Sequence, residues 1–413
     1  MIQMVPEKQT KRGYILRREP WNTLLWSLDR ALSILRAGRS TPAIPSAPHR
    51  ILVSNIAHLG DVVNATAVIP ALRNRFPRAE IGFLTSSWAR PIIENNPEIK
   101  YVHTFDHFLL NRSRLSKWSK FNQHMLSVRR ALREMRKLHY EIAIDTYHFV
   151  QNSIPLLWLA RIPVRIAYTC GGFGPLLTHP MPWISQDKHL VDYHLALLEP
   201  LSLSQSARRM ASPTVFVPLV DTPTLPRRYL VLHPGTGAAF KEWQVDKWCE
   251  LAGMLRQSGY DIVITGAGTH EAAISARIRG IVPSAIDLSG QLSLPQFVRI
   301  IQKARLLVGV DSLAGHLAAA TATPSVLIYT GVNNHAQMRP FAEHSEVVTW
   351  EVSCSPCLRT NGCAGMECVR NVTVARVFQV CLESLRRFPK AVSEPLLGIS
   401  NSRRDESISE WGH

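Results

Sequence analysis

A carboxylate at a strand-to-helix turn is the first feature of this sequence that could perform catalysis. The segment ILVSNIAHLGD indicates a buried strand that ends at Ile56, a turn that contains a glycine, and a helix that Asp61 opens and that continues to Arg75. The N-terminus of a helix holds a carboxylate in place and favours its ionised form. Asp61 is therefore a candidate general base, although capping a helix is the commoner role of an aspartate at this position.

A glycine-containing loop further along the chain could bind phosphate groups. In YLVLHPGTGAAFKEW a strand ends at His233, and the next residues present backbone N–H groups, the hydroxyl of Thr236 and the ammonium of Lys241. Backbone donors and one ammonium suit a pyrophosphate. Glycine also serves turns for purely conformational reasons, so the loop alone is weak evidence.

Two more strand-to-helix turns carry polar residues. The segment DIVITGAGTHE places Glu271 in a first helical turn, where it could accept hydrogen bonds from ribose hydroxyls or simply favour the helix dipole. In LLVGVDSLAGH a strand ends before Asp311 and Ser312, and the helix that follows carries His316. The first N–H groups of that helix are available to an anion, whereas a lone histidine is more often buried and hydrogen-bonded.

These turns belong to an alternation of short apolar strands and amphipathic helices. Strands are expected at 51–56, 81–85, 101–105, 141–147 and 164–168, and again at 229–233, 261–265, 285–288, 306–310 and 325–329. Helical patterns lie between them, for example at 62–76 and 126–138. This alternation over two stretches predicts an α/β chain with two doubly wound, Rossmann-like domains. Three of the four polar turns follow the carboxyl ends of strands, where open α/β sheets bind ligands.

The chain is expected to divide into five segments. Residues 1–49 form a basic, amphipathic N-terminal extension, 50–212 the first domain, 213–228 a proline-rich hinge, 229–390 the second domain and 391–413 a polar tail. In the extension, Pro20 could start a helix in which one apolar stripe holds Trp21, Leu25, Leu28, Leu32 and Leu35. Such a helix could lie on an anionic membrane or pack against the first domain.

The charge balance favours an anionic partner. The 413 residues include 47 Lys and Arg against 31 Asp and Glu, a net charge of +16. This surplus suits nucleic acid, an anionic bilayer or a phosphorylated substrate, but no nucleic-acid-binding module is recognisable. Residues 111–139 concentrate basic side chains, including Arg129, Arg130 and Arg133, which could meet an anionic acceptor or form a solvated helix face.

Composition also bears on location and on metal binding. No apolar run reaches the roughly 18 residues of a membrane-spanning helix and no secretory signal is apparent, so we expect a cytoplasmic protein that could rest on a membrane surface. Seven cysteines, an odd number, argue against a disulfide framework. Four of them have the count for a zinc or iron site, but their irregular spacing leaves ordinary loop cysteines as the default. They are Cys354, Cys357, Cys363 and Cys368.

The polar turns, taken together and in this order, resemble glycosyltransferase family 9, the heptosyltransferases of the bacterial lipopolysaccharide inner core. The matching motifs are Leu59-Gly60-Asp61, His233-Pro234-Gly235 with Lys241-Glu242-Trp243, Gly268 with Glu271, and Asp311-Ser312 with His316-Leu317-Ala318-Ala319-Ala320. The resemblance extends over about residues 50–385, and its motifs are jointly specific although each is weak alone.

The resemblance implies the GT-B architecture, in which two Rossmann-like domains face each other. It also implies an inverting, metal-independent transfer of heptose from a nucleotide donor, ADP-linked, to an anionic glycolipid acceptor at the cytoplasmic face of the inner membrane. Asp61 would be the general base, and the donor would be bound by Thr236, Lys241, Glu271, Asp311, Ser312 and His316. A family member that builds another glycan, such as O-antigen or capsule, is the first alternative, and a sugar-nucleotide epimerase is a weaker one.

Overall fold

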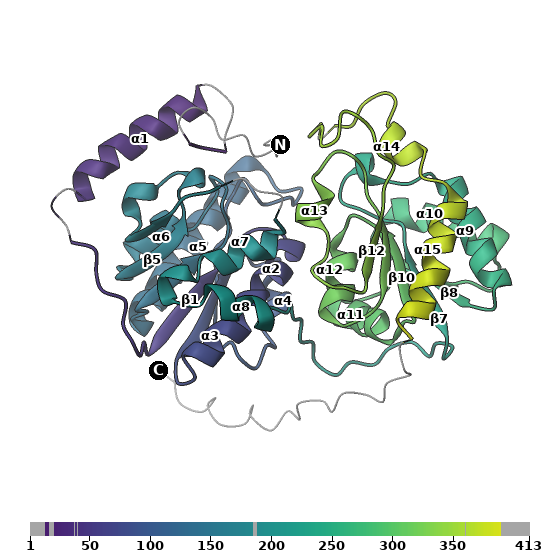
Figure 1. Cartoon of the computed structure of the whole chain (residues 1–413), viewed down its shortest axis with the longest axis horizontal. Helices are drawn as coiled ribbons and strands as arrows, with labels where there is room; N and C mark the ends of the chain where they lie inside the picture. Colours follow the sequence, from purple (N-terminus) through teal and green to yellow (C-terminus); the bar gives the residue numbers. More distant parts are fainter. Residues whose placement is uncertain are drawn as a thin grey trace.

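The computed structural model of the protein describes residues 13–15, 20–36, 38, 40–184, 188–359 and 361–389. These residues form two α/β halves, each built on a six-stranded sheet. Every strand pairing in both sheets is parallel. Figure 1 shows the two halves side by side, each with helices on both faces of its sheet. The predicted pair of doubly wound sheets is therefore confirmed.

The first sheet has the strand order β3-β2-β1-β4-β5-β6. Its strands are β1 (Arg50–Ser54), β2 (Glu80–Thr85), β3 (Tyr101–Thr104), β4 (Ile142–Asp145), β5 (Val164–Tyr168) and β6 (His179–Met181). Because helices cover both faces, Ile51, Leu52 and Val53 of the central strand are all fully buried. The chain reverses its direction across the sheet between β1 and β4, so the crevice for a ligand lies past their carboxyl ends.

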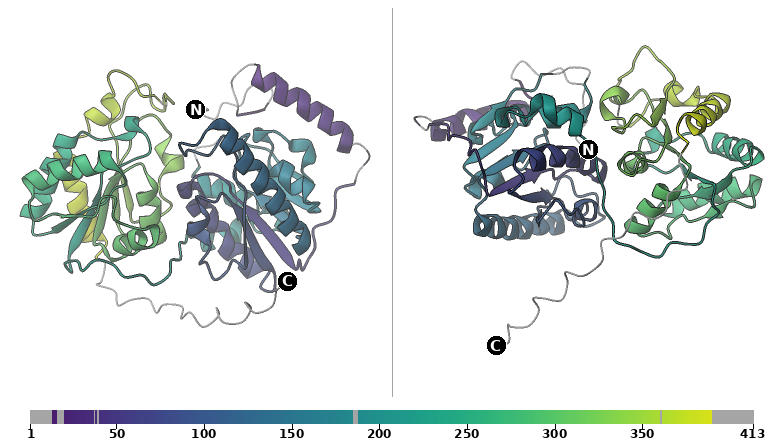
Figure 2. Two further views of the ribbon diagram at one scale, coloured as in Figure 1. Left: turned by 180° about the vertical axis from the view of Figure 1, so that it is seen from behind. Right: turned by 60° about the horizontal axis from the view of Figure 1, so that its bottom comes forward.

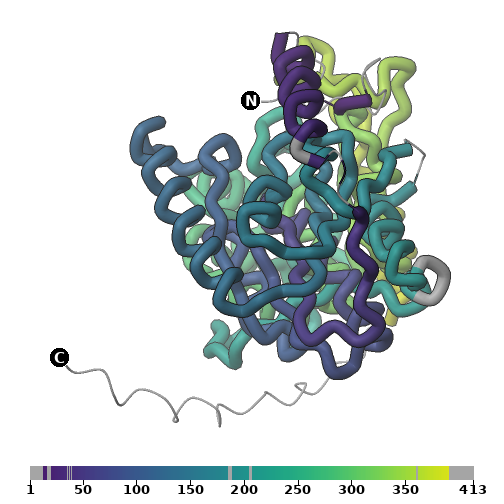
Figure 3. Tube along the Cα trace, turned by 90° about the vertical axis from the view of Figure 1, so that its left-hand side faces the viewer, coloured from purple at the N-terminus to yellow at the C-terminus, as the bar shows by residue number. Residues whose placement is uncertain are grey.

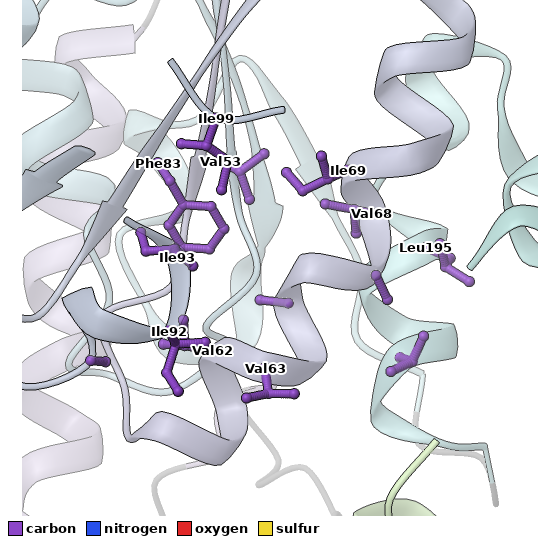
Figure 4. Close-up of a cluster of buried hydrophobic side chains, with 14 of the residues drawn as sticks. Val53, Val62, Val63, Val68, Ile69, Phe83, Ile92, Ile93, Ile99 and Leu195 are labelled. Carbon is purple, nitrogen blue, oxygen red and sulfur yellow. The ribbon is translucent and has the colours of Figure 1, made fainter. Parts of the chain in front are cut away.

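The helix that follows β1 differs from the expectation. It begins as α2 (Leu59–Ala65), passes through a 3-10 turn (Thr66–Val68) and continues as α3 (Ile69–Arg75). Pro70 has no N–H to donate to the preceding turn, which accounts for the break. Asp61 therefore lies inside the first turn of α2 and does not open the helix. Figure 4 shows Val62 of α2 in one apolar cluster with Val53 and Phe83 of the sheet, and this packing holds the start of α2 in place.

The long helix α5 (Lys117–Leu138) begins well before the expected residue 126. Ser116 caps it, because its Oγ accepts a hydrogen bond of 3.1 Å from the backbone N–H of Ser119. Only its second half packs on the sheet, through the buried Ala131 and Met135. The other helices of this half after α3 are α4 (Arg90–Ile93), α6 (Ile154–Leu159), α7 (Leu190–Ala196) and α8 (Ser204–Met210).

The second sheet has the order β12-β11-β10-β7-β8-β9. Its strands are β7 (Tyr229–His233), β8 (Asp261–Ile264), β9 (Ile286–Asp287), β10 (Leu306–Val310), β11 (Ser325–Ile328) and β12 (Ser345–Val348). The helices are α9 (Val245–Gln257), α10 (Thr269–Ile281), α11 (Leu294–Lys303), α12 (Leu313–Ala320), α13 (His335–Met338), α14 (Glu367–Arg370) and α15 (Val374–Arg387). Here the direction reverses between β7 and β10, which places a second crevice past those strands.

The two strands that the sequence did not predict, β6 and β12, each lie at one edge of their sheet. An edge strand pairs on one side only, so its sequence is less constrained: β6 contains Pro180, which cannot donate to a ladder. Residues 213–228 form neither helix nor strand and connect the halves along one side of the molecule, as Figure 2 shows. None of the helices in the described part is both long and apolar enough to cross a membrane.

The N-terminal helix α1 (Trp21–Arg36) divides its apolar residues between two surroundings. Leu25 is buried, and its side chain lies 2.6 Å from where a methyl carbon on Gly172 would be, so the helix packs closely on the first half. Trp21 and Leu28 of the expected stripe are instead exposed. The predicted stripe is therefore only partly the packing face. The side chain of Leu35 and residues 1–12 and 391–413 lie outside the described residues.

Candidate active site

Asp61 lies past the carboxyl end of β1, at the crevice of the first sheet. Its Oδ2 accepts a hydrogen bond of 3.3 Å from the backbone N–H of His58, which holds the carboxylate at the start of α2. Burial raises the pKa of Asp61 to about 6, while the His58 N–H and the positive charges of Arg112 and Lys241 oppose that rise. The carboxylate is therefore largely ionised at neutral pH, yet basic enough to accept a proton.

Arg112 is a residue of this crevice that the sequence placed only in a basic surface run. It lies in the loop between β3 and α5, and its Nη1 is 3.5 Å from where a methyl carbon on Gly237 of the other half would be. Its charge also acts on His58, whose pKa falls to about 4 mainly through burial. The signal that could have identified it is its place in the loop that follows a parallel strand, the usual position of ligand-binding residues.

Lys241 and Asp311 form an ion pair in the second half. The Nζ of Lys241 is 2.6 Å from Oδ2 of Asp311, and both side chains are largely buried. The hydroxyl of Thr236 donates a hydrogen bond of 3.3 Å to the backbone carbonyl of Asp311. Three of the predicted donor-binding residues therefore lie together, past the carboxyl ends of β7 and β10, and Lys241 and Asp311 both act electrostatically on Asp61.

Glu271 lies against the glycines of two loops. A methyl carbon on Gly235 would be 2.5 Å from Cγ of Glu271, and one on Gly266 would be 2.5 Å from its Cβ. Carbon atoms do not approach so closely, so both positions must stay without side chains for Glu271 to occupy this place. The sequence offered conformational freedom as the reason for these glycines, but the structure shows close approach as a second reason.

The start of α12 supplies unpaired polar atoms. Within the described residues, Oγ of Ser312 and Nδ1 of His316 are buried and have no hydrogen-bond partner. Burial lowers the pKa of His316 to about 4, so its ring is neutral at pH 7. The ring lies across from the first half, because a methyl carbon on Gly60 would be 3.0 Å from its Cδ2. A helix N-terminus with unpaired buried groups is suited to an anionic ligand.

The structure thus brings Asp61, Lys241, Asp311 and His316 together between the two halves, in a region that we call the cleft. Arg129, Arg130 and Arg133 lie elsewhere, exposed on α5, and no described interaction joins them to these residues. Figure 1 shows α2 of the first half facing α12 and α13 of the second. The cleft therefore takes Asp61 and Arg112 from the first half, and the Lys241–Asp311 pair and the start of α12 from the second.

The four cysteines of the C-terminal loop are also placed by the structure. Cys354 and Cys363 are exposed, Cys357 is half-buried and Cys368 is buried, and none forms a disulfide. Burial raises the pKa of the Cys368 thiol, and the other three thiols add to that rise, so each of the three lies within electrostatic range of Cys368. Across the described residues, no group of three or more His, Cys, Asp or Glu side chains is arranged to hold a metal ion.

Comparison with known proteins agrees with this geometry. Residues 182–365 match the family described as glycosyltransferase family 9 (heptosyltransferase). The chain is 26% identical over 302 residues to lipopolysaccharide heptosyltransferase 3 of Escherichia coli K12, an alignment that covers 69% of this chain and 83% of that protein. Its identity to lipopolysaccharide heptosyltransferase 1 of Pseudomonas aeruginosa is 22%, over 75% of this chain and 86% of that protein.

A solved structure shows the same fold. The E. coli ADP-heptose lipopolysaccharide heptosyltransferase II superposes with a TM-score of 0.65 at 19% identity, covering 83% of this chain and all of that one. The two facing sheets of this protein are thus those of the GT-B architecture. Residues 182–365 therefore carry the match to the family 9 glycosyltransferase (heptosyltransferase) domain, and the alignments with the two curated relatives extend the similarity to 69% and 75% of the chain.

Proposed function

We propose that this protein transfers heptose, with inversion, from ADP-heptose to an acceptor of the lipopolysaccharide core. The observation that carries the proposal is the meeting, in one cleft, of the Asp61 carboxylate with the Lys241–Asp311 pair and the start of α12. One half offers a base for an acceptor, and the other offers groups for a diphosphate. The names of the relatives, lipopolysaccharide heptosyltransferases 1 and 3, support the choice of sugar and acceptor.

The chemical step needs one base and a stabilised leaving group. Asp61 accepts the proton of an acceptor hydroxyl while the oxygen of that hydroxyl bonds to the anomeric carbon of heptose. The bond from that carbon to the diphosphate breaks at the same time, and its electron pair leaves with ADP. Because the acceptor and the diphosphate approach from opposite halves of the cleft, attack comes from the face opposite the leaving group. The configuration at the anomeric carbon is then inverted.

The second half stabilises the charge that develops on the departing diphosphate. Lys241 supplies an ammonium group, and the first N–H groups of α12 supply oriented dipoles. Asp311 holds Lys241 at the helix start, so this aspartate positions a cation and does not itself face the phosphates. Ser312 and His316 would use their unpaired atoms for the donor, and Glu271 and Thr236 would line its binding loop. These groups make a divalent metal unnecessary for the transfer.

The acceptor and the location follow from the charge of the first half. Arg112 adjoins Asp61 in the cleft, whereas Arg129, Arg130 and Arg133 extend the positive field over the exposed face of α5. A phosphorylated or carboxylated glycolipid would be drawn to this half. We therefore infer a peripheral association with the cytoplasmic face of the inner membrane, where such an acceptor is available.

A structural zinc or iron on Cys354, Cys357, Cys363 and Cys368 is a separate proposal. Its support is the electrostatic proximity of the four thiols around Cys368. Binding would require Cys354 and Cys363 to turn inward from the surface. Metal analysis of protein prepared without chelators tests it: about one metal ion per chain and a lower melting temperature after chelation are expected, and a content near zero rejects it.

The transfer itself is tested with purified protein, ADP-heptose and a core oligosaccharide that lacks heptose. We expect ADP release coupled to a product heavier by one heptose, and inverted stereochemistry at the new linkage. Thermal stabilisation by ADP should exceed that by UDP or GDP. Stronger stabilisation by UDP or GDP would instead favour a family member with another sugar nucleotide. Interconversion of the sugar without transfer would identify an epimerase.

A further inference from the structure

The start of helix α5 carries an exposed apolar surface. Along its first half Trp118, Phe121 and Met125 share one face, at spacings of three and four residues, and all three are exposed, Trp118 to 78%. The loop before the helix adds Phe108, Leu109 and Leu115, which are also exposed. We call these six residues the aromatic tip. Figure 3 shows this end of α5 projecting beyond the body of the first half.

The aromatic tip is an ordered surface. The ring of Phe121 makes edge contacts with those of Phe108, at 6.2 Å, and Trp118, at 6.5 Å, so loop and helix are joined. The loop is fixed at its base, because the backbone N–H of Asp106 donates a hydrogen bond of 3.0 Å to Oγ of Ser127. Large apolar side chains held together in water signal a surface that another phase or molecule covers.

Positive charge surrounds the aromatic tip without compensation. No aspartate or glutamate occurs in the sequence between Asp106 and Glu134, whereas Arg114, Lys117 and Lys120 lie among the aromatic residues. Within the described residues, these three cations have no ion pair. Tryptophan and phenylalanine flanked by lysine and arginine are the combination that binds the interface of an anionic bilayer.

Helix α1 adds a second apolar surface at the same end of the first half. Leu25 holds the helix on the protein, which leaves Trp21, Leu24, Trp26, Leu28 and Ile34 exposed. In Figure 3 and the left-hand view of Figure 2, α1 and the start of α5 both lie toward the upper end of the first half, whereas the right-hand view of Figure 2 shows the two helices on opposite faces of the sheet. A flat lipid surface can meet both helices at once, whereas a groove-binding peptide would contact one.

We propose that the aromatic tip and the outer face of α1 dock this protein on an anionic lipid bilayer. A second copy of the chain is a poorer occupant, because a symmetric contact would bring Arg114, Lys117 and Lys120 against their own copies. The loop that carries the tip also carries Arg112, so the docked surface continues into the cleft beside Asp61. The proposal rests on the proposed function, since an acceptor carried by a lipid must be met at a bilayer.

Co-sedimentation with vesicles tests the docking. The full chain should bind vesicles of phosphatidylethanolamine with one-third phosphatidylglycerol, and bind phosphatidylcholine vesicles at least ten-fold more weakly. Replacing Leu115, Trp118 and Phe121 with Ser should lower the affinity for anionic vesicles at least ten-fold. Replacing Arg114, Lys117 and Lys120 with Gln should do the same at 0.1 M salt. The matched control is Trp350→Ser, which removes an exposed tryptophan from the second half and should bind as the unchanged chain does.

Three further measurements keep this test separate from the transfer reaction. The serine variant should keep its melting temperature, its ADP affinity and its turnover with a water-soluble core oligosaccharide. The proposal is overturned if the wild-type chain binds anionic and neutral vesicles with equal affinity. It is also overturned if the serine variant binds anionic vesicles as tightly as the wild type does. If light scattering shows that the unchanged chain is a dimer and the serine variant a monomer, the surface binds a second copy of the chain instead. Vesicle binding without any transfer activity would reject the proposed function and leave the docking surface standing.

Discussion

His316 of the second half lies against Gly60 of the first, with its Cδ2 3.0 Å from the position that a methyl carbon on Gly60 would occupy. Gly60 is in the first turn of α2, next to Asp61, and His316 is in the first helical turns of α12. The two helix starts that carry the base and the anion-binding groups therefore meet at a residue without a side chain. The approach of the halves depends on that absence.

Gly60→Ala should impair transfer without unfolding the protein. Alanine favours a helix over glycine by about 1 kcal/mol, so the melting temperature should not fall. The added methyl group would push His316 and the facing helix apart by some tenths of an ångström, and kcat/KM should fall about ten-fold through misplacement of the donor. Gly280→Ala is the control, because no atom lies within 4 Å of the methyl group that it adds. Unchanged kinetics in Gly60→Ala would show that the cleft tolerates a wider approach.

Asp61→Asn should lower kcat by about 10²- to 10⁴-fold, the range that a general base contributes. ADP affinity, measured by calorimetry, should stay within a few-fold of wild type because Asp61 belongs to the acceptor side of the cleft. Asp246→Asn provides a control, since it also removes a carboxylate from the first turn of a helix, but at an exposed position. Loss of ADP binding with turnover preserved would instead make Asp61 a donor ligand.

The pH profile should report the ionisation of Asp61. Burial raises the pKa of Asp61 to about 6, and the base acts only when ionised, so kcat/KM should rise with pH through about 6 and level off above. The positive charge of Arg112 lowers that pKa, so Arg112→Gln should move the rising limb to higher pH. Arg114→Gln, two residues away in the same loop, should leave it in place. A limb that moves equally in both variants would indicate a general field effect.

Lys241→Ala should weaken ADP binding by about 1.5–3 kcal/mol, the value of a charge-assisted contact. The measurement is calorimetry with ADP, and Lys303→Ala, an exposed lysine at the end of α11, is the control. Asp311→Asn should weaken ADP binding less, because it removes the partner that orients the lysine and not the lysine itself. An ADP affinity of Lys241→Ala equal to that of the wild type would show that Lys241 is not part of the donor site.

Much of the fold could be predicted from the sequence because local patterns determine it. Buried parallel strands need continuous apolar runs such as 51–56, and surface helices need periodic apolar faces, so ten of the strands were located. The short edge strands β6 and β12 were missed because Pro180 interrupts the first and Ser345 and Glu346 open the second, so neither has a continuous apolar run. The first half of α5 was not predicted because it does not pack on the sheet. Its apolar residues therefore do not form a buried face with helical spacing.

The sequence by itself also determined which residue types follow the strands β1, β7 and β10: Asp61, Lys241, Asp311 and His316. Only the tertiary structure decided what they do to one another. The Lys241–Asp311 pair, the contact of His316 with Gly60, and the reach of Arg112 toward Gly237 join residues that are distant in the chain. The raised pKa of Asp61 arises from burial between two halves that fold on separate sheets. Local periodicity fixes each element, but the distances and desolvation that set chemistry exist only once the halves face each other.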